Sequence, residues 1–299
     1  MGSRTRVIII NVDTVAYTAL AAASARQTMP FDITLIDCSR GEAQIQAAAK
    51  LAAQLDLDYR RWPLQTHGQT LDRLFDNTEA DRLILLDSDA EILDARPMLH
   101  ALEVDPGDHE YGIAWEQPTA RATEAGLPIS LYMARPWIPF CAFTVRHVRE
   151  LIADGASFEA RRVDNDLLWL PSRIRRLISL RRHVPIIRKL DLDRFQSHQQ
   201  TIDGETTPYF EFDTGAALHR TARARGLSLR RLSWDIHEAT VFHVHGGTRS
   251  KLHFWMRNHG ARSEHLARAF HRLRSTYRAQ VTPSLLQGLD HAENNGHTQ

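Results

Sequence analysis

The chain has 299 residues, of which 43% are hydrophobic and 24% charged, a balance typical of globular proteins. Its formal net charge of +1 gives the molecule no strong field for nucleic acid, so we expect no nucleic-acid partner. No stretch approaches the roughly 20 apolar residues of a membrane span, and the start lacks the apolar segment of a signal peptide. We therefore expect a cytoplasmic protein without a transmembrane segment.

The two cysteines, Cys38 and Cys141, are far apart in the sequence and show no C-x-x-C spacing. This pattern indicates neither a disulfide framework nor a zinc ribbon. We expect both to be free, buried thiols.

The first 100 residues alternate between short apolar runs and segments with helical periodicity. This alternation predicts a βαβ series with a mostly parallel sheet, and so an α/β fold. The expected strands are residues 6–12, 32–37, 59–62 and 82–86, and the expected helices are residues 15–28, 42–55 and 68–78.

Beyond residue 105, prolines and glycines divide the pattern into short pieces. Helical signals return at residues 147–153, 165–169 and 214–225, and a strand is expected at 239–244. The last helix is expected over residues 251–274, and the polar end 294–299 is expected to be disordered.

Two carboxylates, Asp87 and Asp89, follow the apolar strand at spacing i, i+2, which places them on the same side of an extended chain. Like charges held together beside a buried strand repel each other unless a cation or hydrogen bonds offset the repulsion. A divalent metal such as Mg²⁺ or Mn²⁺ that also holds phosphate oxygens would do so. The alternative is a loop that caps a helix beginning near Glu91 or Asp94.

The context of these carboxylates resembles the GT-A glycosyltransferases related to family 2, over residues 6 to 250. The resemblance rests on Asp37-Cys38-Ser39 after the second strand, on the segment 67–72, and on Leu85-Leu86-Asp87-Ser88-Asp89, which looks like a D-x-D motif. It implies one GT-A-like domain with a Rossmann-like central sheet flanked by helices. A nucleotide-sugar-binding half would span 1–105, an acceptor-binding half 106–250, and a C-terminal helix with a disordered tail 251–299.

The resemblance also implies a nucleotide-diphosphate sugar as donor and a divalent metal, Mn²⁺ or Mg²⁺. Asp37 would read the base, and Asp13 would join it in binding the nucleotide sugar. Asp89 would bind the metal, while Asp87 would hold the ribose, a metal-bound water or the metal itself.

The segment Tyr209 to Gly215 looks like the acidic motif that begins an acceptor-side helix in these enzymes. Asp213 is then the candidate catalytic base for an inverting transfer, which must deprotonate an acceptor hydroxyl. Many relatives have adjacent Glu-Asp, whereas Phe212 separates Glu211 from Asp213 here, so Glu211 is the alternative base. Asp164 and Asp166 could instead supply the base or grip the acceptor, although helix capping is the commoner role for such residues, and Asp213 could likewise be the N-cap of its helix.

Two histidines at strand spacing, His243 and His245, precede a Gly-Gly turn. Relatives place a histidine before such a turn, where it can complete the metal or diphosphate site. His243 fits that pattern better, His245 is the alternative, and either could be structural. Arg249 could contact the diphosphate or form a surface ion pair.

Two further features bear on the acceptor, which the sequence does not identify as saccharide, lipid carrier, protein or small molecule. The Arg-rich segment 172–189 interleaves apolar residues and could touch an anionic membrane surface, grip a phosphorylated acceptor, or form a solvated helix face. Trp115, Glu116 and Trp137 could line an acceptor cleft or simply pack in the core.

Two other functions share parts of this pattern. A nucleotidyltransferase acting on sugar phosphates would ordinarily show a Gly-rich, basic loop after strand one, and residues 12–22 contain neither glycine nor lysine. A non-catalytic nucleotide-sugar-binding module would keep the same fold.

Overall fold

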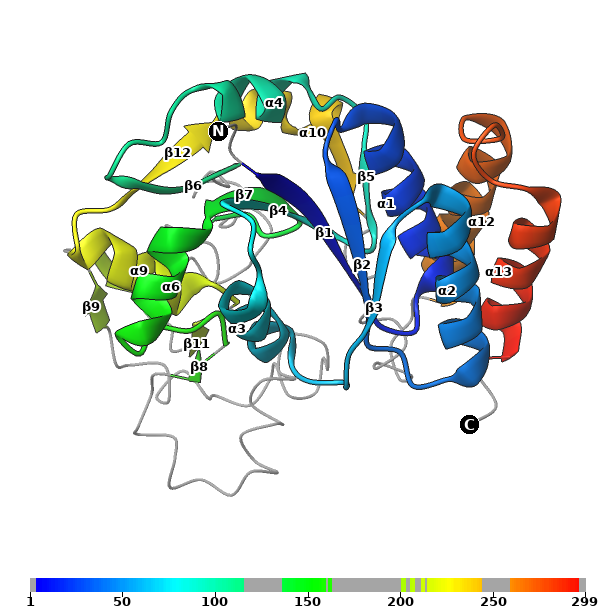
Figure 1. Ribbon diagram of the computed structural model, residues 1–299, viewed down its shortest axis with the longest axis horizontal. Helices are drawn as coiled ribbons and strands as arrows, with labels where there is room; N and C mark the ends of the chain where they lie inside the picture. The colour runs from blue at the N-terminus through cyan, green and yellow to red at the C-terminus, as the bar shows by residue number, and fades with distance from the viewer. Residues whose placement is uncertain are drawn as a thin grey trace, which may run out of the picture.

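The computed structural model describes residues 4–115, 136–159, 161–162, 200–202, 205–207, 211–212, 214–243 and 259–295. At its centre lies a seven-stranded sheet with the order β12-β6-β7-β4-β1-β2-β3 (Figure 1). β7 runs antiparallel to β4 and β6, and the other neighbouring strands are parallel, so the predicted mostly parallel sheet is confirmed. The strands are β1 (Thr5–Asn11), β2 (Asp32–Asp37), β3 (Asp58–Arg61), β4 (Arg82–Asp87), β6 (Glu110–Trp115), β7 (Phe140–Thr144) and β12 (Ser228–Leu232).

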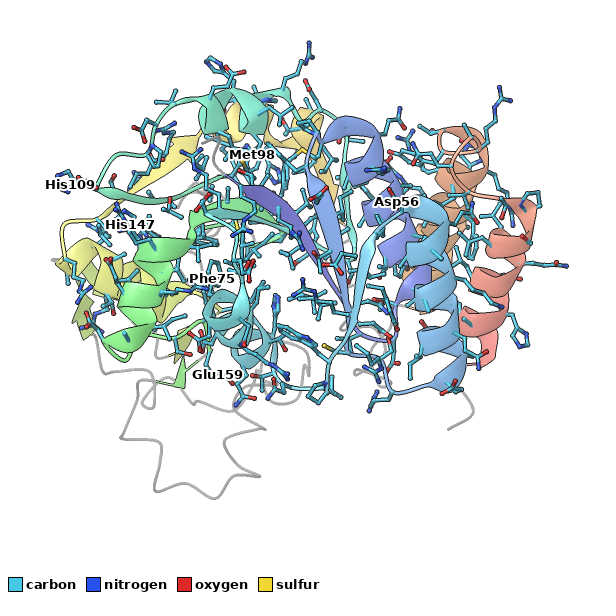
Figure 2. All side chains as sticks on the ribbon, viewed as in Figure 1. Asp56, Phe75, Met98, His109, His147 and Glu159 are labelled. Carbon is cyan, nitrogen blue, oxygen red and sulfur yellow. The ribbon has the colours of Figure 1, made fainter. Side chains whose placement is uncertain are left out.

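The central strands are buried on both faces, which explains their continuous apolar runs. In β1, Val7 and Ile9 belong to one hydrophobic core and Ile8 to the other, as the two-residue repeat of a strand requires. Phe75 points into the second core and stacks on Phe158 with ring centroids 5.2 Å apart (Figure 2). The sheet therefore divides the molecule into two packed layers.

Helices cover both faces of the sheet (Figure 1). The first core takes residues from α1 (Val15–Thr28), α2 (Glu42–Leu55), α4 (Arg96–Glu103), α12 (His259–Ser275) and α13 (Pro283–Asn295). The second takes residues from α3 (His67–Asn77), α6 (Val145–Ala153) and α9 (Ala216–Ala224). Among the described residues, no helix combines the length and apolar character that a membrane crossing requires.

Within the described residues, three antiparallel two-stranded ribbons accompany the main sheet. The one that matters for the site pairs β5 (Ala90–Ile92) with β13 (Val241–His243), which follows the short helices η3 (Trp234–Ile236) and α10 (His237–Thr240). The others pair β8 (Arg161–Arg162) with β11 (Glu211–Phe212), and β9 (Gln200–Ile202) with β10 (Glu205–Thr207).

The strand expected at 239–244 begins later than predicted. Thr240 ends α10, where its hydroxyl donates to the Ile236 carbonyl at 2.8 Å, and strand pairing begins only at Val241. The first two residues of the predicted strand, Ala239 and Thr240, thus lie in a helical turn. Val244 lies outside the described residues.

The C-terminal region also differs from the prediction. The described part of the helix expected over 251–274 is α12, and a further helix, α13, follows it. Thr282 caps α13, since its hydroxyl accepts from the Leu285 N–H at 3.3 Å, and Pro283 occupies the first turn. Asn294 and Asn295, expected to be disordered, belong to this helix.

Candidate metal and nucleotide site

The two carboxylates of the D-x-D segment lie in a turn between two strands. Asp87 ends β4, and its N–H donates to the Pro139 carbonyl at 2.9 Å. Asp89 leads directly into β5, and the next helix, α4, begins only at Arg96. The helix-cap interpretation of these carboxylates is therefore wrong, because a strand follows them.

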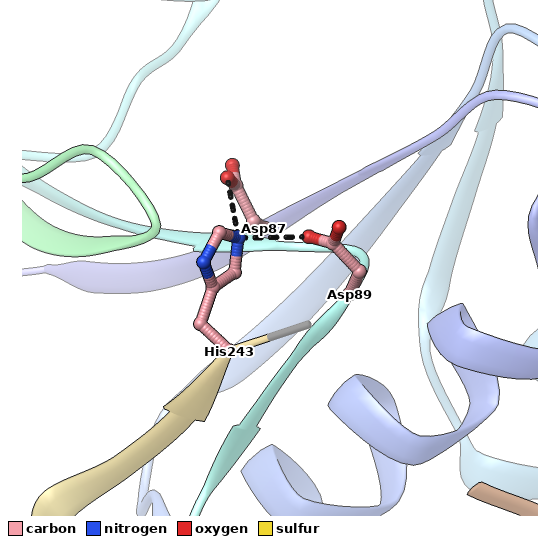
Figure 3. Close-up of side chains that lie close together, drawn as sticks. All are labelled: Asp87, Asp89 and His243. Atoms are coloured by element: carbon pink, nitrogen blue, oxygen red, sulfur yellow. Dashed lines mark ion pairs between the residues drawn. The ribbon is translucent and has the colours of Figure 1, made fainter. Parts of the chain in front are cut away.

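The β5–β13 ribbon brings His243 beside both carboxylates (Figure 3). His243 pairs with Ala90 across the ribbon, and its Nε2 lies 3.2 Å from Asp89 Oδ1 and 3.8 Å from Asp87 Oδ2. One potential ligand atom from each residue lies within 4.8 Å of the others. The structure thus joins segments about 150 positions apart in the sequence.

The three side chains differ in their exposure. The side chain of Asp89 is 4% exposed, that of His243 12%, and that of Asp87 27%, so the site opens to solvent on the Asp87 side. Two carboxylates at this separation repel each other, and burial strengthens the repulsion. A divalent cation fits this donor set, because carboxylate oxygens and an imidazole nitrogen are common metal ligands.

Asp37 belongs to a different polar network at the end of β2, which is separated from β4 by β1. Its Oδ1 accepts from the Asn11 amide at 2.9 Å and the Ser39 N–H at 3.1 Å, and its Oδ2 accepts from the Tyr59 hydroxyl at 2.9 Å. The side chain has no exposed surface, and the Arg61 guanidinium lies 3.9 Å away. These contacts tie the ends of β1, β2 and β3 together.

Asp13 holds the loop that follows β2. Its carboxylate accepts from the Arg40 N–H at 2.9 Å and the Gly41 N–H at 3.3 Å, and the Arg40 side chain adds an ion pair at 3.1 Å. The backbone of Asp13 has φ 51°, a left-handed conformation that Asp tolerates better than most residues. Asp13 therefore shapes the edge of the sheet next to Asp37.

Neither cysteine lies in an environment that would activate its thiol. Both are free and buried, as predicted. Burial, with a contribution from the Asp37 carboxylate, raises the pKa of the Cys38 thiol to about 11. Burial likewise raises the pKa of Cys141 well above its ordinary value. Both are neutral thiols near pH 7.

An aromatic cluster lies beside the histidine of the site. The Trp137 ring meets the His243 ring edge-on at 5.5 Å, and it contacts the rings of Trp115, Trp234 and His237 as well. Trp115 is completely buried and stacks on Phe140, so it packs in the core and does not line a cleft. Trp137, 8% exposed, is mostly covered and borders the site through His243.

Several predicted site residues lie outside the described part of the chain: Asp213, Asp164, Asp166, His245, Arg249, Glu116 and the segment 172–189. The backbone of Glu211 is described and pairs with Arg162 between β11 and β8. The structure therefore brings together Asp87, Asp89 and His243, and it places Asp13 just after β1 and Asp37 at the end of β2.

Sequence reasoning missed the residues that organise this edge, chiefly Asn11 and Ser39. The Asn11 amide donates to Asp37 and to the Ser39 hydroxyl at 2.8 Å, and its oxygen accepts from the Thr18 hydroxyl at 2.7 Å. The signal was a single asparagine ending an otherwise apolar strand. A buried amide there requires polar partners, and these come from the end of β2, the loop after it and α1.

Comparisons with known proteins identify no family. No family model matches the chain, and no curated protein matches its sequence. Similar solved structures include the galactosyltransferase LgtC with donor and acceptor sugar analogues, at TM-score 0.36 and 16% identity over 48% of this chain and 59% of that one. S. aureus TarS 1–349 in complex with UDP-GlcNAc has a TM-score of 0.35 and 15% identity over 49% of this chain and 47% of that one. The glycosyltransferase GlyE of Streptococcus pneumoniae TIGR4 has a TM-score of 0.35 and 12% identity over 62% of this chain and 40% of that one.

The chain thus spans less than two thirds of each of these three proteins, and likenesses of this size do not assign it to a family. What the structure itself establishes is the α/β class, with a mostly parallel seven-stranded sheet and helices on both faces.

Proposed function

We propose that the protein is a metal-dependent glycosyltransferase that moves a sugar from a nucleotide diphosphate to an acceptor hydroxyl. The observation that carries the proposal is the convergence of Asp87, Asp89 and His243 at the carboxyl end of β4. Open α/β sheets bind ligands at this edge. The resemblance of the Leu85–Asp89 segment to the D-x-D motif of GT-A enzymes supports the same function.

The donor set favours Mn²⁺ over Mg²⁺. Mg²⁺ prefers oxygen ligands in near-ideal octahedral geometry, whereas this site offers one nitrogen with two carboxylates. When bound, the cation supplies positive charge that offsets the charge of the departing diphosphate. His245, just beyond His243 in the sequence, is the alternative histidine ligand.

The transfer breaks the bond between the anomeric carbon and the diphosphate oxygen and forms a bond from that carbon to the acceptor oxygen. The acceptor proton must go to a base, and Asp213 is the proposed one, with Glu211, Asp164 and Asp166 as alternatives. A single in-line displacement of this kind inverts the anomeric configuration.

On the donor side, Asp37, Asp13 and Arg249 are the proposed nucleotide-binding residues. The complete burial of Asp37 favours an indirect role, in which its carboxylate fixes the strand ends against which the nucleotide binds. The greater exposure of Asp87 than of Asp89 supports a role for Asp87 in contacting the ribose or a water on the metal.

The nucleotidyltransferase alternative finds less support. Such enzymes commonly bind phosphate at the N-terminus of the first helix. Here the Val15 N–H donates to Gln44 Oε1 at 3.0 Å and the Ala16 N–H donates to Glu293 Oε1 at 3.3 Å. The chain's own side chains therefore occupy this end of α1, whereas a cation held by Asp87 and Asp89 would attract a diphosphate to their turn.

The experiment is calorimetric binding of UDP, GDP and dTDP with and without Mn²⁺. Wild type is expected to bind one of them in a Mn²⁺-dependent manner, and Asp89→Ala is expected to lose that binding. Asp108→Ala, whose side chain is 82% exposed on the surface, is the matched control and should bind as wild type does. If wild type binds none of the three nucleotides, the proposed function is wrong. Binding without hydrolysis or transfer of any sugar would favour the non-catalytic module.

A further inference from the structure

The β5–β13 ribbon is the element that sets the distance between Asp89 and His243. Each strand has three residues, with Val241 opposite Ile92, Phe242 opposite Glu91, and His243 opposite Ala90. A two-stranded ribbon this short is marginally stable by itself. Its geometry must therefore be maintained by what packs against it.

Helix α12 contacts both members of the middle pair of this ribbon. Arg272 donates from Nε to Glu91 Oε1 at 2.8 Å and also from Nη2 to the same oxygen. The Arg268 guanidinium lies 3.8 Å from the centroid of the Phe242 ring. Arg268 and Arg272 are four residues apart, so they project from the same face of the helix. One helix face thus contacts both strands, one position away from the pair that includes His243.

The Glu91 carboxylate that Arg272 contacts has no exposed surface. A buried charge is stable only when it is paired and hydrogen-bonded. Beyond the two bonds from Arg272, the Tyr277 hydroxyl donates to Glu91 Oε1 at 2.8 Å. Three donors from α12 and the turn after it therefore converge on one oxygen of β5, two residues from Asp89.

We infer that α12 is a positioning element for the metal site, with Arg272 acting through Glu91 and Arg268 acting through Phe242. Arg272, Tyr277 and Arg268 hold the ribbon in the register and position at which Asp89 and His243 can share a cation. The inference rests on the proposed metal-dependent function, and it adds residues that touch neither the metal nor the substrate.

The test compares the full-length variants Arg272→Lys, Tyr277→Phe and Arg268→Ala with wild type. Arg230→Ala is the matched control, since Arg230 Nε donates to a mostly buried glutamate, Glu110, at 2.7 Å between β12 and β6 of the main sheet. The first readout is the Mn²⁺ dissociation constant from calorimetry. The second is hydrogen exchange of the amides of residues 90–93 and 241–243 without metal.

Arg272→Lys is expected to weaken Mn²⁺ binding about tenfold, the lower end of the effect of removing a group that orients a metal ligand. Tyr277→Phe and Arg268→Ala should weaken it less, and Arg230→Ala should leave it unchanged while lowering the melting temperature. The ribbon amides should exchange faster in Arg272→Lys than in Arg230→Ala. If Arg272 had a purely structural role, both Arg272→Lys and Arg230→Ala would lower stability, and the Mn²⁺ dissociation constant of Arg272→Lys would stay at the wild-type value. That result would overturn the inference.

Failure of the proposed function gives a different result. If wild type binds no Mn²⁺, the metal site is wrong, and hydrogen exchange decides the role of α12 by itself. Faster exchange of the ribbon in Arg272→Lys and Tyr277→Phe than in the control would show that α12 holds the ribbon in place, although not for a metal, and equal exchange in all variants would overturn this hold as well.

Discussion

Two groups of aspartates lie at the carboxyl ends of β2 and β4, the two parallel strands that flank β1, and they are arranged in opposite ways. Asp37, after β2, receives hydrogen bonds from Asn11, Ser39 and Tyr59 and is completely buried. Asp87 and Asp89, after β4, face each other and His243 at a site that opens toward solvent. The first arrangement neutralises a charge with the chain's own donors, whereas the second concentrates negative charge where a cation can bind.

The difference indicates how to separate a structural carboxylate from a functional one. A buried carboxylate with several internal donors contributes to stability, and its removal leaves those donors unsatisfied. Converging carboxylates destabilise the metal-free protein slightly and are explained by a ligand. The two groups should therefore respond to substitution in opposite ways, in function and in stability.

The largest expected effect is the loss of function in Asp89→Asn. The substitution keeps the shape of the side chain and removes one charge of the proposed metal site, so transfer activity should fall at least about 1000-fold, which corresponds to about 4 kcal/mol. The free energy of unfolding of the metal-free protein should stay within about 1 kcal/mol of wild type, because one repulsive charge is removed. Steady-state kinetics and urea unfolding measure the two quantities. An active Asp89→Asn enzyme would remove the distinction between the two groups.

Asp37→Ala should show the reverse pattern in stability. It leaves the Asn11 amide and the Tyr59 hydroxyl without their acceptor, so the free energy of unfolding should fall by about 3 kcal/mol. The shift of the urea midpoint measures this effect. Asp32→Ala, at the exposed start of the same strand, is the control and should have almost no effect. Equal midpoints for the two variants would contradict a structural role for Asp37.

Metal addition should stabilise the protein only while the Asp87–Asp89 group is intact. At a Mn²⁺ concentration 100 times the dissociation constant, the native state gains about 2.7 kcal/mol. For a chain of this size the melting temperature should rise by roughly 5 °C. Asp37→Ala should show the same rise from its lower starting point, and Asp89→Asn should show none. A rise in Asp89→Asn that EDTA reverses would place the metal elsewhere.

The sequence predicted the sheet better than the surroundings of the site. The apolar runs of β1, β2 and β4 predict strands that are buried on both faces. A strand with one face in solvent would instead alternate apolar and polar residues. The i, i+2 spacing of Asp87 and Asp89 and the histidine at 243 also pointed to the trio that the structure brings together. Each of these signals is local or has a known spacing.

The remaining contacts depend on long-range packing, which periodicity does not report. Nothing near Glu91 in the sequence indicates that Arg272 will neutralise it, 181 residues away. Helix α13 did have a local signal, Thr282-Pro283 before the leucines at 285, 286 and 289, but the polar residues after it suggested a disordered end. Its role against α1 and α2 follows only from tertiary contacts such as the bond from Gln44 Nε2 to the Ala292 carbonyl at 3.0 Å.

The smallest expected effect, and the one that refines the comparison most, is that of Asp13→Asn. Asparagine keeps an oxygen that can accept from the Arg40 and Gly41 N–H groups, and it tolerates the left-handed backbone at this position. What is lost is the ion pair with Arg40, whose side chain is 67% exposed, so the free energy of unfolding should change by less than about 1 kcal/mol. If Asp13 only shapes the loop, nucleotide affinity should stay at the wild-type value. If its charge contacts the donor, nucleotide affinity should change while stability does not, and Asp13 would then belong with Asp87 and Asp89 rather than with Asp37.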